Sequence, residues 1–88
     1  MDAVAAEIRE IIGTLFQQIE MDHLSDDTSL REVGVSSLDF VKIVLAIELK
    51  YDFEYPVEYM RYEYLDTVLK IADTIGKIKG GQTDESHQ

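Results

Sequence analysis

The chain has 88 residues, which is enough for one small domain with a modest core, and it contains no cysteine, so a disulfide framework and a Cys-based metal site are excluded. Eighteen acidic residues against eight basic ones give a net charge of −10, which argues against nucleic acids and anionic membranes and favours basic partners. No segment approaches the roughly 18 apolar residues of a spanning helix, and no apolar signal core is present. We therefore expect a cytoplasmic protein with no membrane association.

The first predicted element is an amphipathic helix over residues 4–19. Its apolar positions recur at spacings of three and four: Ile8, Ile11, Ile12, Leu15, Phe16 and Ile19. Gly13 lies within this pattern, at a cost of about 1 kcal/mol relative to alanine.

A long loop is predicted over residues 20–36, because turn and cap formers dominate it and no periodicity is sustained. Ser29 and Glu32 have the spacing of a capping box, which favours a short helical turn there. Apolar residues are spaced so that they could hold the loop against a core: Leu24, Leu30, Val33 and Val35. A loop of this length without regular structure suggests a functional role.

A second helix is predicted over residues 38–51. It is apolar on more than one face, which indicates a central helix or a face that awaits a partner. Its β-branched residues leave a buried strand as the competing prediction, but its length and the absence of flanking strands favour a helix.

The remaining elements follow Pro56, which closes the second helix region. A short helix is predicted over residues 57–62, and Asp66 is a candidate N-cap for a last helix that ends at Lys79 before Gly80 and Gly81. We expect residues 1–80 to form the domain and residues 81–88 to be a polar, disordered tail. The predicted class is all-α, with three main helices, one short helix and a long loop between the first two main helices.

The segment from Gly34 to Asp39 carries the functional signal. Ser36 is placed to cap the second helix, Asp39 would answer it from the third helical position, and the side chain of Ser37 would point outward without a capping role. On this local pattern alone, paired serines before an apolar helix favour a plain cap.

The wider sequence resembles the acyl and peptidyl carrier protein family, whose hallmark is Gly-x-Asp-Ser-Leu at the start of the second helix. Here the same register holds Gly34-Val35-Ser36-Ser37-Leu38. The likeness extends to three further segments: Ile11-Ile12-Gly13, Asp27-Thr28-Ser29-Leu30, and Leu38 through Pro56. Thr67-Val68 also resembles the start of the family's last helix. In all, the likeness covers roughly residues 5–78.

This resemblance implies a right-handed helical bundle and a 4′-phosphopantetheine arm attached to Ser37. The arm would supply the thiol that the chain lacks and would hold acyl or aminoacyl groups as thioesters. The protein would not be an enzyme. It would act as a monomer with three kinds of partner: a phosphopantetheinyl transferase, an acyl- or aminoacyl-loading enzyme, and downstream synthases or transferases. Neither the cargo nor a link to a larger synthase follows from the residues.

Ser36 departs from the family pattern, because it stands where the family has an aspartate beside the metal of the transferase. The two residues are equivalent as caps but differ in charge. A degenerate, unmodified carrier-like domain that only binds a protein partner therefore stays open as the alternative.

The second helix is the family's docking helix, and in this chain its charge is mixed, which favours a specialised or secondary-metabolite pathway. The resemblance suggests these docking residues: Asp39, Phe40, Lys42, Ile43, Glu48 and Leu49. For Phe40, packing on the long loop is an equal alternative. The aromatic residues between Tyr51 and Tyr64 are predicted to serve mainly in packing, with a cargo pocket or docking surface as the second interpretation.

Other kinds of site have little support. His23 and His87 lack ligand partners at useful spacing for zinc, and no EF-hand loop for calcium is present. Nothing marks the third group and oxyanion site that a serine hydrolase needs.

Overall fold

A computed structural model describes residues 3–85, and its regular structure is entirely helical. The α-helices are α1 (Ala3–Leu15), α2 (Ser37–Tyr51), α3 (Tyr62–Leu65) and α4 (Val68–Glu85). Two 3-10 helices, η1 (Met21–His23) and η2 (Val57–Tyr59), lie in the connections. The prediction of an all-α bundle with three main helices and a short one is confirmed, and the predicted short helix is resolved into η2 and α3.

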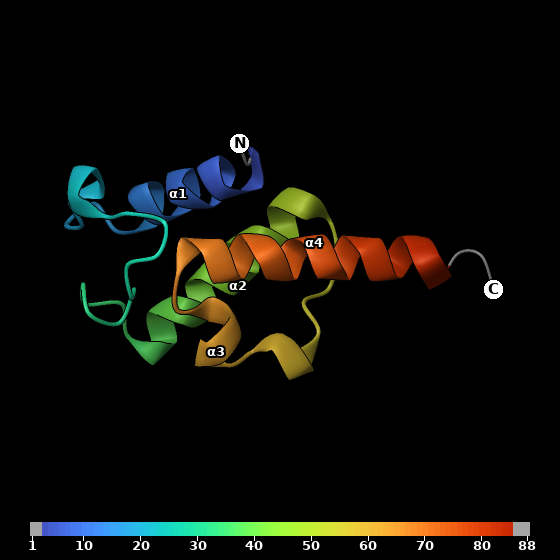
Figure 1. Cartoon of the computed structure of the whole chain (residues 1–88). Coiled ribbons are helices and arrows are strands. Elements are labelled where there is room, and N and C mark those ends of the chain that lie inside the picture. The colour runs from blue at the N-terminus through green and yellow to red at the C-terminus, as the bar shows by residue number, and fades with distance from the viewer. Residues whose placement is uncertain (1–2, 86–88) are drawn as a thin grey trace.

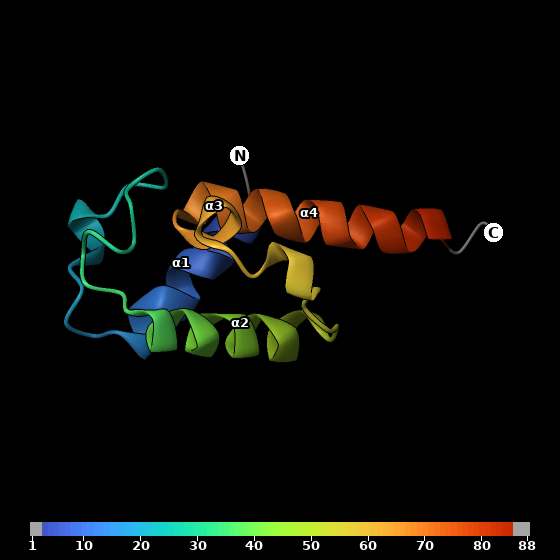
Figure 2. The ribbon, with the colours of Figure 1, turned by 90° about the horizontal axis from the view of Figure 1, so that it is seen from below.

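Helix α1 runs opposite to α2 and α4, which run in the same general direction (Figures 1 and 2). The long loop between α1 and α2 lies at one end of the bundle. The beginnings of α2 and α4 face that same end, and α3 sits beside the start of α4. The later turns of α4 project past the other elements at the opposite end.

The core forms because each main helix turns one apolar stripe inward at spacings of three and four residues. Helix α1 contributes Ala5, Ile8 and Ile12, and α2 contributes Phe40, Ile43, Val44 and Ile47. Helix α4 contributes Val68, Ile71, Ala72, Ile75 and Ile78. Burial of a side chain of this size stabilises the fold by about 1.5–3 kcal/mol.

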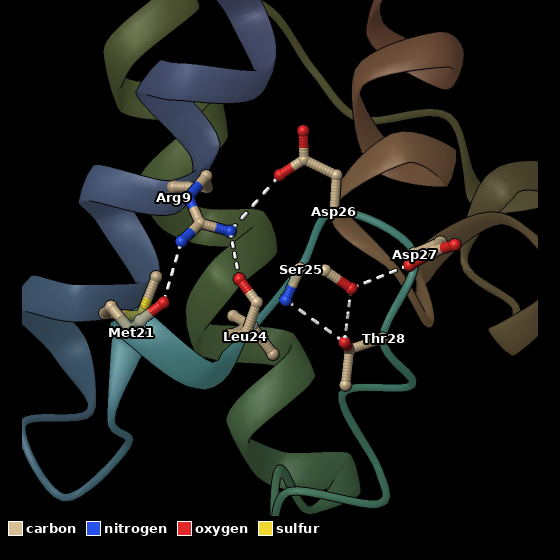
Figure 3. Close-up of polar contacts among 7 residues, drawn as sticks. All are labelled: Arg9, Met21, Leu24, Ser25, Asp26, Asp27 and Thr28. Atoms are coloured by element: carbon tan, nitrogen blue, oxygen red, sulfur yellow. Dashed lines mark hydrogen bonds and ion pairs between the residues drawn. The ribbon is translucent and has the colours of Figure 1, made fainter.

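The long loop is held by buried apolar side chains and by hydrogen bonds from α1. Leu24, Leu30 and Val35 are buried as predicted, whereas Val33 is exposed. Figure 3 shows Arg9 of α1 reaching across to the loop, where its guanidinium donates to the carbonyls of Met21 (2.8 Å) and Leu24 and to the carboxylate of Asp26 (3.2 Å).

A local turn completes this part of the loop. The Ser25 hydroxyl donates to Asp27 (2.7 Å), and the backbone N–H of Ser25 donates to the Thr28 hydroxyl (3.1 Å) (Figure 3). Further along, the Ser29 hydroxyl accepts a hydrogen bond from the N–H of Glu32 at 3.4 Å. Successive backbone hydrogen bonds between residues three apart close turns over residues 29–34, so the short helical turn predicted there is present, as turns and not as a regular helix.

Asp66 has a different role from the predicted one. Helix α4 begins at Val68, and the Thr67 hydroxyl accepts the hydrogen bond from the N–H of Lys70 (3.0 Å) that an N-cap accepts. The Asp66 carboxylate is instead buried and receives hydrogen bonds from the Ser29 hydroxyl (2.7 Å) and from the N–H of Arg31 (3.1 Å). Asp66 therefore fastens the long loop to the α3–α4 junction.

The predicted end of the last helix at Lys79 is also wrong, because α4 continues through Gly80 and Gly81 to Glu85. Each glycine costs a helix about 1 kcal/mol, but no proline follows to remove a hydrogen bond, and a Cβ on Gly80 would meet nothing within 4 Å. Residues 86–88 of the predicted disordered tail lie outside the described residues. Among the helices of the described part, none has the length and apolarity needed to cross a membrane.

Candidate functional site

The beginning of α2 is fixed by a reciprocal cap. The Ser36 hydroxyl accepts a hydrogen bond from the N–H of Asp39 (3.2 Å), and the Asp39 carboxylate accepts one from the N–H of Ser36 (3.0 Å). This second hydrogen bond is the main reason that the pKa of Asp39 is lowered from its usual value. The predicted capping box is therefore confirmed.

Ser37 is the first residue of α2, and its side chain is exposed. Among the described residues its hydroxyl has no hydrogen-bond partner, because Ser36 performs the capping. The position is held by a rigid helix end, while the hydroxyl itself stays available to a reagent. This arrangement suits covalent modification by a partner enzyme.

A cavity of about 440 Å³ adjoins Ser37 between α2 and the η2–α3 segment. Its apolar walls come from Phe40, Val41, Met60, Tyr62 and Leu65. Arg61 also lines it and provides its only fully charged side chain. The cavity is therefore lined by the serine at the start of α2, by apolar side chains and by one charged residue, Arg61.

One wall of this cavity is held by interactions among three segments. The Tyr62 ring meets the Phe40 ring edge-on with 5.4 Å between centroids, and the Arg31 guanidinium lies 4.2 Å from the Tyr62 centroid. Arg31 also pairs with Asp66 at 3.2 Å. The long loop, α2 and the α3–α4 junction are thus joined beside Ser37. Sequence reasoning missed Arg31 and Arg61, since their neighbours are distant along the chain and no local motif marks them.

Two of the predicted docking residues are not available at the surface. Phe40 is 4% exposed and Ile43 is fully buried, so both belong to the core. The prediction went wrong because α2 is apolar on several faces, and only packing decides which face turns inward. The Phe40 ring meets the ring of Tyr62 in α3.

The other predicted docking residues lie on or near the surface. Asp39 and Lys42 form an ion pair at 3.8 Å. Glu48 accepts a hydrogen bond from the N–H of Tyr55 (2.8 Å), so it fixes the chain where it leaves α2. Leu49 is 86% exposed.

An exposed apolar stripe runs along the outer side of α2. It consists of Leu38, Val41, Leu45 and Leu49, which are spaced by three or four residues and therefore share one face. This α2 stripe begins next to Ser37 and continues to the last turn of the helix. A run of exposed apolar side chains of this kind marks a candidate interaction surface.

The aromatic residues between Tyr51 and Tyr64 serve mainly in packing, as predicted. Tyr51 stacks on Phe53 with 6.3 Å between centroids, and Tyr59 meets Tyr64 edge-on at 5.0 Å. Tyr62 is the exception, because its ring also lines the cavity beside Ser37.

This site and fold define a carrier domain, and comparison with known proteins agrees. Residues 3–75 match the family model described as the phosphopantetheine attachment site, so the chain belongs to this family. Members of the family carry covalently attached 4′-phosphopantetheine.

Among its relatives is the aminoacyl carrier protein of Agrobacterium fabrum, which is 31% identical over 78 residues and is matched over 88% of this chain and 94% of its own length. A similar chain, 30% identical with a TM-score of 0.75, occurs in the crystal structure of an engineered Bradyrhizobium japonicum glycine:[carrier protein] ligase complexed with carrier protein from Agrobacterium tumefaciens and ATP. The alignment covers 83% of this chain and 96% of that one.

A further similar chain comes from the Bradyrhizobium japonicum ligase complexed with its cognate carrier protein and an analogue of glycyl adenylate. It is 24% identical, with a TM-score of 0.77 and coverage of 86% of this chain and 99% of that chain. At this identity the likeness concerns the fold.

Proposed function

We propose that this chain is an aminoacyl carrier protein that bears its phosphopantetheine arm on Ser37. The observation that carries this proposal is the exposed Ser37 hydroxyl, which stands at the first position of α2 and takes no part in the cap. The 31% identity to an aminoacyl carrier protein, over nearly the full length of both chains, favours aminoacyl cargo over fatty acyl cargo.

The residues at this position fit the group. A phosphodiester on Ser37 would stand at the N-terminus of a 15-residue helix, where unpaired backbone N–H groups favour an anion. When bound, the arm supplies the thiol that forms the thioester, and this chain has no cysteine that could compete for the cargo. The chain itself holds and presents the cargo, and its partners perform the chemistry.

The first test is modification with coenzyme A and a broad-specificity phosphopantetheinyl transferase, read by intact mass. The wild type should gain one phosphopantetheinyl group, whereas Ser37→Ala should gain none. Ser36→Ala is the matched control, because it removes the neighbouring hydroxyl and should still be modified. A folded wild-type chain that gains no mass would refute the proposal and favour the alternative, a carrier-like domain that only binds proteins, for which the uncharged Ser36 is the supporting observation.

The second test concerns the cargo. The modified protein should accept an amino acid from a glycine:[carrier protein] ligase in the presence of ATP, and mild thiol treatment should release it from the thioester. Fatty acyl groups supplied by an acyl-loading enzyme should be accepted less well. The reverse preference would remove the aminoacyl assignment and keep the carrier assignment. We also propose a specialised biosynthetic pathway, because α2 carries mixed charge, with Lys42 and Lys50 beside Asp39 and Glu48.

We further propose that the loading enzyme docks on the α2 stripe, which includes Leu49, aided by the neighbouring charges of Asp39 and Lys42. Replacement of Leu45 or Leu49 by alanine should raise the KM of the ligase for the carrier and leave kcat little changed. Val57→Ala is the matched control, because Val57 is also exposed but lies outside α2. Equal effects of all three substitutions would show that docking does not depend on this stripe.

A further inference from the structure

Four of the eight lysine and arginine side chains of this chain form ion pairs with acidic residues. Arg9 pairs with Asp26, and Arg31 pairs with Asp66. Two lysines are likewise paired, Lys42 with Asp39 and Lys77 with Asp73. In a chain with a net charge of −10, an arginine without an acidic partner leaves its guanidinium available to an anionic group.

Arg61 is such a residue. It is exposed, it precedes α3, and its guanidinium has no ion pair or hydrogen bond among the described residues. It lines the same cavity as Ser37, although the two residues come from different elements. The fold therefore brings Arg61, whose guanidinium has no partner among the described residues, to a cavity that the exposed Ser37 also lines.

An arginine is well suited to a phosphate group. The guanidinium is planar, is always charged at neutral pH and can donate two parallel hydrogen bonds to phosphate oxygens. The neighbourhood of Ser37 also contains a negative group, since Asp39 lies in the first turn of α2. An added phosphodiester would be repelled by Asp39 and attracted by the N-terminus of α2. A nearby cation would add to the attraction and hold the phosphodiester in one position.

We propose that Arg61 is a positioning residue that pairs with the phosphodiester on Ser37 and directs the first part of the arm along the cavity. This inference rests on the proposed modification of Ser37 and goes beyond it, because it assigns a role to a residue of the η2–α3 segment. The remaining walls of the cavity are apolar and would contact the uncharged part of the arm.

The chain has three arginines, so their side-chain Nε–Hε signals in a ¹⁵N–¹H NMR spectrum can be assigned by substitution one at a time. Loading with phosphopantetheine should shift the Arg61 Nε–Hε signal and slow its exchange with water. The Arg9 signal should stay in place, because the Arg9 guanidinium is already bonded to Met21 and Asp26 and Arg9 does not line the cavity beside Ser37. The ³¹P signal of the loaded protein should move with added salt, and this dependence should be lost in Arg61→Gln.

Lys50→Gln is the matched control. It makes the same change in charge at the other end of α2, about 20 Å along the axis from Ser37, and should leave the ³¹P signal and its salt dependence unchanged. Arg61→Lys should restore part of the effect, since the charge returns without the paired donors.

Intact mass on the same samples separates the two proposals. Loaded protein in which the Arg61 signal does not move, and in which Arg61→Gln has the wild-type ³¹P behaviour, would overturn the role of Arg61 and leave the carrier function standing. Folded protein that cannot be loaded at all would overturn both.

Discussion

The attachment of the long loop to the α3–α4 junction should depend on Asp66 more than on any other carboxylate of the described residues. Asp66 is 6% exposed, and its carboxylate receives hydrogen bonds from the Ser29 hydroxyl and from the N–H, Nε and Nη2 of Arg31. Asp66→Ala removes every one of these and leaves the partly buried Ser29 hydroxyl without the acceptor to which it donates. The side chain of Arg31 is about half exposed, so it would recover hydration.

The expected loss follows from these contacts. Hydrogen bonds to a charged group contribute about 1.5–3 kcal/mol each when shielded, whereas an exposed ion pair adds only up to about 1 kcal/mol. After allowance for the hydration of Arg31, Asp66→Ala should lower the free energy of unfolding by about 2–4 kcal/mol, and Asp66→Asn should lie between it and the wild type. Urea unfolding measures this difference, and the corresponding fall in Tm is roughly 10–25 °C.

Asp73→Ala is the control, because Asp73 is 70% exposed and pairs with Lys77 on the surface of α4. It should cost under about 0.5 kcal/mol. If Asp66→Ala were as mild as Asp73→Ala, the loop would not be held through Asp66, and the pairing of Arg31 with Asp66 would not support the cavity wall beside Ser37.

The pH dependence gives an independent check on the same contact. Burial pushes the pKa of Asp66 upward, but the hydrogen bonds from Arg31 and Ser29 outweigh burial, and the pKa is lowered overall. A lowered pKa in the folded state contributes stability that is complete above the unfolded pKa of about 3.9 and is lost as the pH falls through the folded value. The stability difference between wild type and Asp66→Asn should therefore shrink below about pH 4.

Three further predictions test local features by thermal or urea unfolding. Ser36→Ala should cost about 1 kcal/mol through the lost cap, whereas Ser37→Ala should cost under about 0.5 kcal/mol, and the reverse order would mean that the start of α2 is misplaced. Tyr55→Phe should leave the free energy of unfolding unchanged or raise it by roughly 1 kcal/mol, because the buried Tyr55 hydroxyl has no hydrogen-bond partner among the described residues. Burial also raises the pKa of this hydroxyl to about 12. A clear loss of stability would reveal a partner. Gly76→Ala should stabilise α4 by about 0.5–1 kcal/mol, since a Cβ there meets nothing within 4 Å, while Gly34→Ala should cost about 1–3 kcal/mol because Gly34 has a φ of +102°; similar effects at both glycines would contradict this contrast.

The parts of the site that sequence reasoning predicted are those fixed by neighbours in the chain. The cap between Ser36 and Asp39, and the outward position of Ser37, depend only on residues within one helical turn. The helix periods of α1 and α4 are also local patterns, and most of the apolar residues on their predicted inner faces are buried. The prediction was wrong at the end of α1, which stops at Leu15 and not at residue 19, and Leu15 is 39% exposed.

The parts that were missed depend on contacts between distant segments. Asp66 has the composition of an N-cap, and only the folded chain brings Ser29 and Arg31 to it. Phe40 and Ile43 could not be told from the exposed apolar residues of α2, because a helix that is apolar on several faces gives no sign of which face its neighbours will cover. The cavity beside Ser37 was hidden for the same reason, since α2 and the η2–α3 segment form it together.

Ser36 stands where the family pattern has an aspartate, and the structure shows what this difference changes. Serine and aspartate stabilise a helix start about equally, and the cap of α2 is complete with Ser36, so the exchange costs the fold little. Its consequence is electrostatic, because Asp39 is then the only acidic residue in the first turn of α2. A phosphodiester on Ser37 would face one neighbouring carboxylate fewer and would have Arg61 within the same cavity. The charge pattern around Ser37 is thus the feature by which a partner enzyme could distinguish this carrier from relatives that have aspartate at this position.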